Sequence, residues 1–209
     1  SEILIRRLDA LGVETLLGFN CAGITGDDTA AGVVSYAGDI IEGDLVAIAT
    51  GVRSNIEIAR SSKLAIHRGI AVDDHMQTSA PNIYAAGDVA EWNNEWYGII
   101  PWALSTAKVA AQNMVDFGSA KFKGITAANT LQVTGIDLSS AGIVHVESPE
   151  YDQVVSIDRA AGTYYKAVIK DNVVVGCISL GDRRIAMHLR SLISKKTDVS
   201  GMRGSIFEP

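Results

Sequence analysis

Apolar residues recur along the chain at helical spacing in four places. Leu4, Leu8 and Leu11 fall on one face of a helix, and Gly12 follows them as a C-terminal cap. Pro101 stands where it is preorganised for the first turn of a second helix, whose apolar positions include Leu104, Val109, Met114 and Val115. The pattern predicts helices over residues 1–11, a short part of 56–66, 101–116 and 182–194.

Short β-rich runs between turn residues predict the extended segments. Gly26–Asp28 and Asp171-Asn172 are turn signals, and the second joins two runs as a tight hairpin. The run at 45–51 is continuously apolar, which suits a strand covered on both faces. We expect residues after Thr197 to form a tail. Strands are predicted over 13–17, 32–36, 40–42, 45–51, 69–73, 83–85, 129–136, 154–158, 164–170 and 173–179.

Composition narrows the class of protein without naming it. The 209 residues allow one large or two small domains, and 47% hydrophobic with 20% charged residues is an ordinary globular composition. A net charge of −6 and the lack of a dense basic run argue against a nucleic-acid surface. No apolar run is long enough to cross a bilayer. Cys21 and Cys177 form no disulfide framework, so we expect a cytoplasmic protein.

The polar clusters favour turns over metal sites. The four histidines have no metal-ligand spacing, and Asp73–His75 is better explained as a polar turn, because adjacent residues rarely converge on one ion. Asp27-Asp28 lacks the spaced oxygen ligands of a calcium loop. Trp92, Trp96, Tyr97 and Trp102 suit either a ligand platform or a packing cluster. We therefore expect no metal, and no residue pairs with another as a general acid, base or nucleophile.

The stretch from Thr78 to Ala90 carries the clearest chemistry. It reads as a turn, a short strand and a small-residue elbow that ends in a carboxylate. Gly87 has no side chain, so a ligand can lie against its backbone. Asp88 offers two acceptor oxygens after the strand, where open α/β sheets bind ligands. This combination suits a sugar-alcohol or ribose hydroxyl.

That stretch closely resembles the second flavin-binding motif of the pyridine nucleotide-disulfide oxidoreductases. The resemblance implies that Asp88 binds the ribityl chain of FAD, with Gly87 and Val89 beside it. It also implies that the helix from Pro101 points its N-terminus at the flavin ring, with Trp102 and Ala103 nearest. The list of implied cofactor-binding residues is completed by Thr50 and Gly51, in a run that resembles the family's Ala-Thr-Gly junction, although Ser54 replaces a proline usual in the family.

The segment 119–209 resembles the dimerisation domain of these reductases. Its run from Asn129 to Ile136 is most similar to the rubredoxin reductase and nitrite reductase flavoprotein branch. The implied fold is α/β and α+β: the C-terminal remnant of two nucleotide-binding, Rossmann-like domains, followed by a small α+β dimerisation domain. We expect the C-terminal part of an NAD(P)-binding domain over 1–49, that of an FAD-binding domain over 50–118, and the dimerisation domain over 119–209.

Two family features do not occur in this sequence. It contains neither of the Gly-x-Gly-x-x-Gly turns that would hold FAD and NAD(P)H pyrophosphates, and no closely spaced redox cysteine pair. We therefore expect the chain to be the C-terminal part of a longer enzyme. Truncation or proteolysis explains its length better than a naturally short protein does. Such a chain should retain FAD weakly or not at all and be inactive alone. It should also form a homodimer or larger oligomer, or be disordered in its first fifty residues, because sheet edges lack partners.

The resemblance implies an oxidoreductase that passes electrons from NAD(P)H through FAD to an acceptor such as rubredoxin or a nitrite-reductase partner. The alternative is a non-catalytic dimerisation or interaction module in which 119–209 folds alone. Flavin binding discriminates between these two hypotheses.

Overall fold

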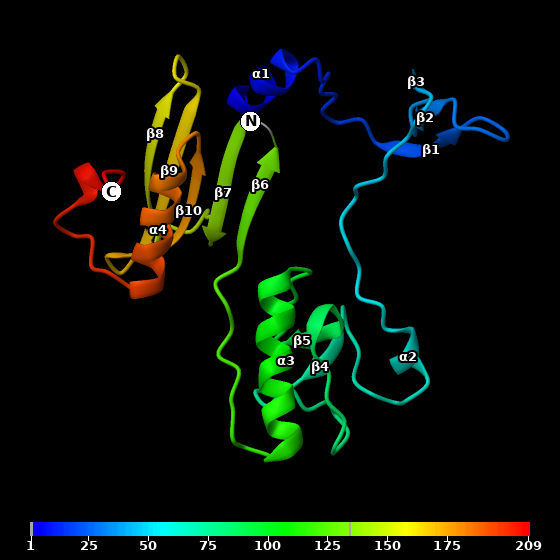
Figure 1. Ribbon diagram of the computed structural model, residues 1–209, viewed down its shortest axis with the longest axis vertical. Coiled ribbons are helices and arrows are strands. Elements are labelled where there is room, and N and C mark those ends of the chain that lie inside the picture. The colour runs from blue at the N-terminus through cyan, green and yellow to red at the C-terminus, as the bar shows by residue number, and fades with distance from the viewer. Residues whose placement is uncertain (1, 134) are drawn as a thin grey trace. The chain divides into compact units, whose positions relative to one another are not determined.

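The computed structural model describes residues 2–133 and 135–209, and the chain divides into two units, Ser1–Gly51 and Val52–Pro209 (Figure 1). The first contains α1 (Glu2–Ala10), β1 (Cys21–Thr25), β2 (Gly32–Ser35) and β3 (Ile40–Glu42). The second contains α2 (Glu57–Arg60), β4 (Ile70–Val72), a 3-10 turn η1 (Gly87–Val89), β5 (Ala90–Trp92), α3 (Ile100–Val115), β6 (Ala128–Val133), β7 (Ile136–Gly142), β8 (Asp152–Asp158), β9 (Thr163–Lys170), β10 (Val173–Leu180), α4 (Arg183–Lys195) and η2 (Arg203–Ser205).

The first unit is a helix followed by a three-stranded antiparallel sheet of order β1-β2-β3. The predicted first helix is confirmed over Glu2–Ala10, and the predicted strands at 32–36 and 40–42 are confirmed as β2 and β3. Gly12 has φ +77, and the Val13 N–H donates to the Leu8 carbonyl at 3.0 Å. This left-handed residue and backward hydrogen bond end the helix as a glycine cap should.

Two strands predicted in this unit are wrong. Residues 13–17 and 45–51 have no regular structure, and Leu17, Leu45 and Ile48 are 75%, 89% and 72% exposed. A strand exists only where a second strand completes its hydrogen bonds. Neither segment has such a partner among the described residues, so an apolar sequence alone does not make either one a strand.

In the second unit, the region before residue 118 is built on α3 and the parallel pair β4–β5. The predicted helix at 101–116 is confirmed, although it begins at Ile100, and the strand at 69–73 is confirmed as β4. The short helix predicted within 56–66 is confirmed only over Glu57–Arg60, as α2. The strand predicted at 83–85 is wrong, since only Tyr84 pairs, in an isolated bridge with Gln77.

Helix α3 buries a different face from the one its apolar residues suggest. Trp102, Thr106, Ala110 and Asn113 are buried, whereas Leu104, Met114 and Val115 are 67%, 67% and 91% exposed. The buried polar residues have partners: the Asn113 Nδ2 donates to the carbonyls of Val109 and Ala120. Polar side chains can therefore lie inward because each one is hydrogen-bonded there.

The C-terminal region is a five-stranded antiparallel sheet of order β6-β7-β10-β9-β8, with α4 packed on it. Its core includes Ile169, Val174, Leu189 and Ile206. The predictions at 154–158, 164–170, 173–179 and 182–194 are confirmed. The single strand predicted at 129–136 is wrong: β6 ends at Val133 and β7, which was not predicted, begins at Ile136, while Thr134 lies outside the described residues.

Local signals set two joints of this region. Asp171 and Asn172 have φ 51 and 60, the left-handed pair of a type I′ hairpin turn. Asp182 caps α4 by accepting the Arg184 N–H at 2.7 Å. The hydrogen bond from the Arg184 side chain, followed by the one from its backbone N–H, holds the pKa of Asp182 below its ordinary value.

The expectation of a C-terminal tail is wrong. Val199 and Ile206 are fully buried in the core beneath α4 and the sheet. The Val199 N–H donates to the Asn172 carbonyl at 2.8 Å, and Arg203 pairs with Asp152 at 2.8 Å. The last residues therefore close the domain. Of the helices described, none combines the length and apolar character needed to cross a membrane.

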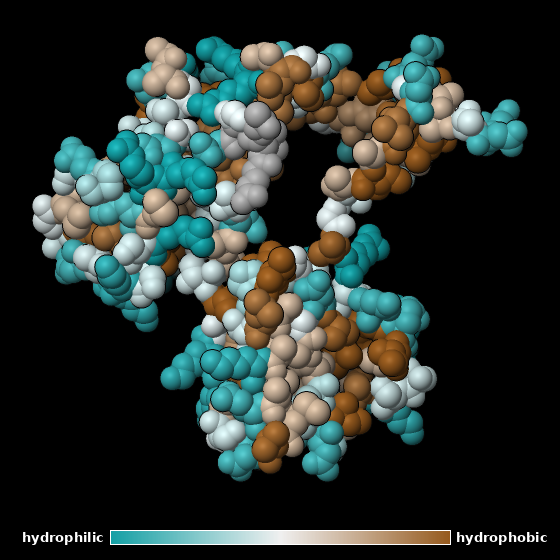
Figure 2. Space-filling view, viewed as in Figure 1, coloured by the Kyte–Doolittle hydropathy of each residue, from teal (hydrophilic) through white to brown (hydrophobic). Residues whose placement is uncertain are grey.

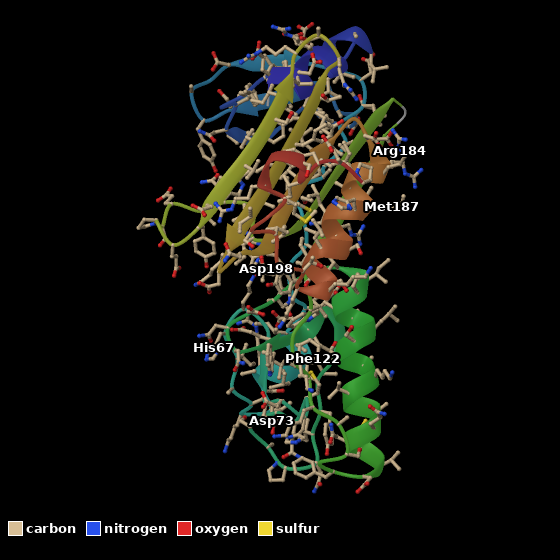
Figure 3. All side chains as sticks on the ribbon, turned by 90° about the vertical axis from the view of Figure 1, so that its left-hand side faces the viewer. His67, Asp73, Phe122, Arg184, Met187 and Asp198 are labelled. Atoms are coloured by element: carbon tan, nitrogen blue, oxygen red, sulfur yellow. The ribbon has the colours of Figure 1, made fainter. Side chains whose placement is uncertain are left out.

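Leu189 and Met187 provide a matched pair on α4. Leu189 is fully buried, whereas Met187, labelled in Figure 3, is 64% exposed. We expect Leu189→Ala to lower the free energy of unfolding of this domain by about 2–5 kcal/mol, because it leaves a cavity. Met187→Ala should change it by less than about 0.5 kcal/mol. Hydrogen exchange of peptides from β9 and β10 measures both. Equal losses in the two variants would contradict the packing described here.

Candidate functional site

The Gly87–Val89 turn presents an unpaired carboxylate. Ala86 is extended (φ −148), and Gly87 then has φ +79, a left-handed conformation that favours glycine. Asp88 is exposed, and its carboxylate has no hydrogen-bond partner among the described residues. The turn thus projects two free acceptor oxygens from a backbone that a side chain at Gly87 would strain.

Two side chains from other segments hold this turn. The Gly87 N–H donates to the hydroxyl of Thr106 at 2.9 Å, and that hydroxyl donates in turn to the Trp102 carbonyl at 2.8 Å. Thr106 is fully buried on α3. On the other side, the Trp96 Nε1 donates to the Asp88 carbonyl at 2.6 Å.

The first turn of α3 lies against the same glycine. A Cβ added to Gly87 would be 4.0 Å from the Cβ of Ala103. No side chain caps the helix, and the N–H groups of Ile100 and Trp102 have no partner within the described residues, while Pro101 has no N–H. Unpaired N–H groups and the helix dipole give this end partial positive charge. The structure therefore brings Gly87 and Asp88 together with the predicted residues Pro101, Trp102 and Ala103.

The packing alternative holds for three of the four aromatic residues considered from the sequence. Trp102 is fully buried, with edge-on contacts to Tyr97 at 5.2 Å and to Phe122 at 5.3 Å, and Trp92 meets Phe122 at 5.0 Å. Burial, followed by the charge of Glu95, raises the pKa of Tyr97. The Trp102 Nε1 is buried with no partner in the described part of the chain.

The family models decide the relationship. A model described as pyridine nucleotide-disulphide oxidoreductase matches residues 1–113, which is more than half of the chain. The chain belongs to this family. A second model, the rubredoxin NAD+ reductase C-terminal domain, matches residues 128–197.

Individual relatives agree with the family models. The chain is 35% identical to a nitrite reductase (NAD(P)H) of Bacillus subtilis over 95% of its length, which is 25% of that protein. It is 31% identical to the NADH-rubredoxin oxidoreductase of Clostridium acetobutylicum over 75% of its length, or 40% of that protein. The chain thus spans between a quarter and a half of the relatives it matches.

A solved structure shows the same fold. A ferredoxin reductase from Rhodopseudomonas palustris superposes with a TM-score of 0.77 at 24% identity, over 95% of this chain and 50% of that one. The mixed α/β architecture is therefore that of the flavoprotein reductases, whose members depend on FAD and NAD(P)H.

The residues around Gly87 fit a flavin. Asp88 has free acceptor oxygens for a hydroxylated chain, Gly87 permits close approach, and the start of α3 has unpaired N–H groups. The buried Trp102 Nε1 is the kind of polar atom that a bound ligand or water satisfies. The Trp102 side chain is fully buried, so its indole ring presents no exposed face to a flavin. The predicted proximity of Trp102 to the flavin ring therefore applies to its backbone at the start of α3.

Three of the predicted site residues have less local support. Val89 lies half-buried in η1 and packs against the cluster of Ala59, Ile70, Ala85 and Ala90. Thr50 and Gly51 belong to the first unit, in an exposed segment without strand pairing, so their proposed contact with a cofactor stays a prediction.

Glu91, three residues after Asp88, is a buried carboxylate that the sequence did not reveal. It is only 5% exposed in β5, accepts the Gly69 N–H at 2.7 Å and lies 3.3 Å from the Nδ1 of His67. A buried carboxylate needs such partners. Nothing in the local sequence separates Glu91 from an exposed strand residue, because its partners are 22 and 24 positions earlier.

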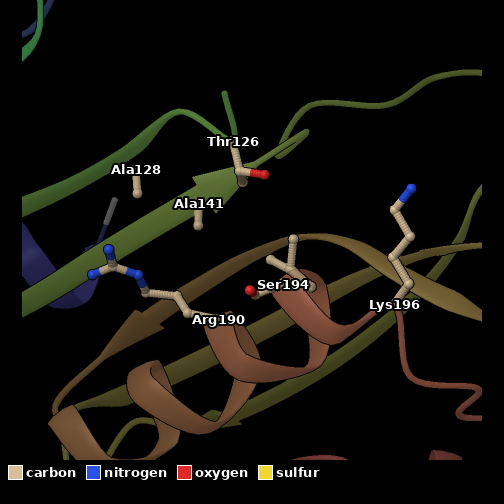
Figure 4. Close-up of a pocket in the computed structure, with 7 residues that line it drawn as sticks. Thr126, Ala128, Ala141, Arg190, Ser194 and Lys196 are labelled. Carbon is tan, nitrogen blue, oxygen red and sulfur yellow. The ribbon is translucent and has the colours of Figure 1, made fainter. Parts of the chain in front are cut away.

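A separate cavity of about 320 Å³ lies in the C-terminal domain (Figure 4). Ala128 and Ala141 line it from the sheet, and Arg190 and Ser194 from α4. The sequence assigned Arg190 only to a solvated helix face, and the structure adds this cavity to that description. All its polar residues are exposed, which is equally typical of a solvated surface.

The cysteines and acidic clusters supply no other centre. Cys21 is exposed and Cys177 is buried, and both are free. No group of three His, Cys, Asp or Glu side chains that could hold a metal occurs among the residues described. Burial raises the pKa of the Cys177 thiol to about 11, partly opposed by a backbone hydrogen bond at Ala141 and the charge of Arg190.

The thiol of Cys177 should therefore be unreactive in the folded protein. At pH 8 we expect one thiol, Cys21, to react promptly with a chromogenic disulfide, and Cys177 to react only after unfolding, because the thiolate is the nucleophile. Since folding favours the neutral thiol, the contribution of Cys177 to stability is present below pH 9 and falls as pH rises towards 11. A Cys21→Ser variant that still reacted promptly would contradict this assignment.

Proposed function

We propose that this chain is the C-terminal part of a flavoprotein oxidoreductase that passes electrons from NAD(P)H through FAD to an acceptor protein. The observation that carries the proposal is the Gly87–Asp88 turn held against the start of α3. Family membership supports it, since members depend on FAD and NAD(P)H. The proposed activity would require nucleotide-binding segments with glycine fingerprints, which do not occur in this sequence.

The residues of this chain would bind and orient the cofactor, while the flavin itself supplies hydride and electron transfer. Asp88 would accept hydrogen bonds from ribityl hydroxyls, and Gly87 would let that chain lie against the backbone. The N-terminus of α3 would favour negative charge on the ring by its dipole. The cluster of Tyr97, Trp102 and Phe122 would keep the helix start fixed and dry beneath it.

The acceptor is proposed from the relatives. Two of those matched are named for nitrite reduction and for rubredoxin, so we propose a redox protein or a nitrite-reductase partner. The nucleotide-binding remnants over 1–49 and 50–118, and a dimerising domain over 119–209, are parts of the same proposal. The cytoplasmic location stays a prediction. The chain alone should hold FAD weakly, because it contains neither glycine fingerprint.

Replacement of Asp88 tests the cofactor site. In the polypeptide extended through the coding sequence upstream of Ser1, we expect a flavin absorbance band that NAD(P)H bleaches. Asp88→Ala should weaken FAD binding by about tenfold or more, because hydrogen bonds to a charged group are lost. Fluorescence titration of the apoprotein with FAD measures the change.

Asp116→Ala is the matched control, since this exposed aspartate lies at the other end of α3. It should leave FAD affinity within about twofold of the unaltered protein. An upstream sequence without glycine fingerprints, or undiminished FAD affinity in Asp88→Ala, would contradict the proposal.

A second proposal, self-association, is favoured by the outer face of α3. Ile100, Leu104, Met114 and Val115 are 75%, 67%, 67% and 91% exposed, and Ala107 and Ala111 are exposed between them. Figure 2 shows this apolar stripe along the helix. Exposed apolar stripes of this kind are typical of protein–protein contacts.

Sedimentation velocity tests the association. We expect the chain to sediment as a dimer or larger species, and Leu104→Glu to weaken association by about tenfold or more, because a charge would have to be buried. Gln112→Glu, also exposed on α3, is the control and should have little effect. A monomer at all concentrations, or equal effects of the two variants, would contradict this proposal.

A further inference from the structure

Trp96 makes a short hydrogen bond that the cofactor-binding proposal does not use. Its Nε1 donates to the Asp88 main-chain carbonyl at 2.6 Å, which leaves the Asp88 carboxylate untouched. Trp96 lies in the segment between β5 and α3, eight residues beyond Asp88. The hydrogen bond therefore links the backbone of the turn to the segment that connects β5 and α3.

A cation covers the ring that makes this bond. The Arg68 guanidinium lies 4.5 Å from the centroid of the Trp96 ring, and Arg68 has no carboxylate partner in the described residues. A cation over the face of an indole is attracted by the electrons of the ring. Arg68 also directly follows His67, which pairs with the buried Glu91 at 3.3 Å, and precedes Gly69, whose N–H Glu91 accepts. The contacts of His67 and Gly69 with Glu91 therefore hold the segment that carries Arg68 against β5.

Room for the indole is provided by a glycine. A Cβ added to Gly98 would lie 3.0 Å from the outer edge of the Trp96 ring and closer still to Val52. Only glycine at this position permits both neighbours to stay where they are. The Trp96 ring thus has Arg68 over its face and Gly98 close to its outer edge.

The turn is consequently restrained from two sides. Thr106, on α3, accepts the Gly87 N–H at 2.9 Å, and Trp96 donates to the next residue's carbonyl. The first bond fixes the left-handed glycine, and the second fixes the peptide plane that follows the Asp88 side chain. Since the carboxylate has no partner within the described chain, its direction depends on this backbone.

We propose that Trp96, seated under Arg68, is a positioning residue that holds the Asp88 carboxylate in its ligand-binding direction. The role rests on the proposed function for its ligand, a ribityl hydroxyl, but the restraint itself concerns this chain alone. Trp96 touches the Asp88 carbonyl and acts through it. The alternative is that Trp96 only packs against its neighbours and that its hydrogen bond does not direct the Asp88 carboxylate.

Hydrogen exchange separates positioning from packing without any cofactor. The Gly87 and Ala90 N–H groups donate to Thr106 and to the Gly87 carbonyl, so their exchange rates report on the closed turn. Trp96→Phe keeps an aromatic ring at this position and removes the N–H donor together with the rest of the pyrrole ring, a loss of volume that Trp92→Phe shares. We expect exchange of these two amides, measured by NMR, to quicken about tenfold.

Trp92→Phe is the matched control. Trp92 also donates through its Nε1, but to Asp74 at 3.0 Å, and it also packs in the aromatic cluster. The Trp92→Phe variant should leave the exchange rates of the Gly87 and Ala90 amides within about twofold of those in the unaltered chain. Arg68→Met should quicken them about threefold, as expected for loss of an exposed cation–π contact. Unchanged rates in Trp96→Phe, or equal rates in the two tryptophan variants, would overturn the proposal.

A second readout links the restraint to the cofactor. In the extended polypeptide, Trp96→Phe should weaken FAD binding by about threefold to tenfold, and Trp92→Phe should not. If Asp88→Ala leaves FAD affinity unchanged, the cofactor proposal fails, while the exchange result still decides the restraint. If Asp88→Ala weakens FAD and Trp96→Phe alters neither exchange nor affinity, the positioning role fails and the cofactor site stands.

Discussion

The hydrogen bond between the Gly87 N–H and the Thr106 hydroxyl is the contact on which the site depends. It joins a left-handed glycine to a fully buried threonine on α3, and the same hydroxyl donates to the Trp102 carbonyl. These two hydrogen bonds therefore fix the position of the turn relative to the start of the helix. Without that bond, an exposed carboxylate and a helix terminus would have no fixed relation, and neither would by itself be a ligand site.

Much of the C-terminal domain could be predicted because its signals are local. The Asp171-Asn172 turn sets the register of β9 and β10, and Asp182 starts α4 with its own side chain. Both effects act within a few residues, so a reading of the sequence finds them. The hairpin of β6 and β7 was missed because 129–136 was predicted as one strand, although the alternation of Leu131 and Val133 changes phase before Ile136 and Leu138.

The failures elsewhere share one physical cause: the missing information lies in a distant partner. The runs at 13–17 and 45–51 have strand composition, yet a strand needs another chain segment to take up its N–H and C=O groups. The same dependence hid Glu91, whose partners at Gly69 and His67 are far away in sequence. On α3, Thr106 lies inward because it accepts the N–H of Gly87, which is far away in sequence, whereas the inward Asn113 binds Ala120, just beyond the end of the helix.

The residues of the candidate site also differ in whether their roles depend on distant partners. Gly87 and Asp88 could be singled out from the sequence, because backbone freedom and an acceptor pair are properties of the residues themselves. Thr106 and Trp96 could not, since their roles arise only when α3 and the segment after β5 return to the turn. A carboxylate that binds a neutral hydroxylated chain gains from being held in one direction, because each hydrogen bond loses strength rapidly as its angle departs from linear. The restraining residues therefore determine how well the recognised motif can bind, although no local pattern reveals them.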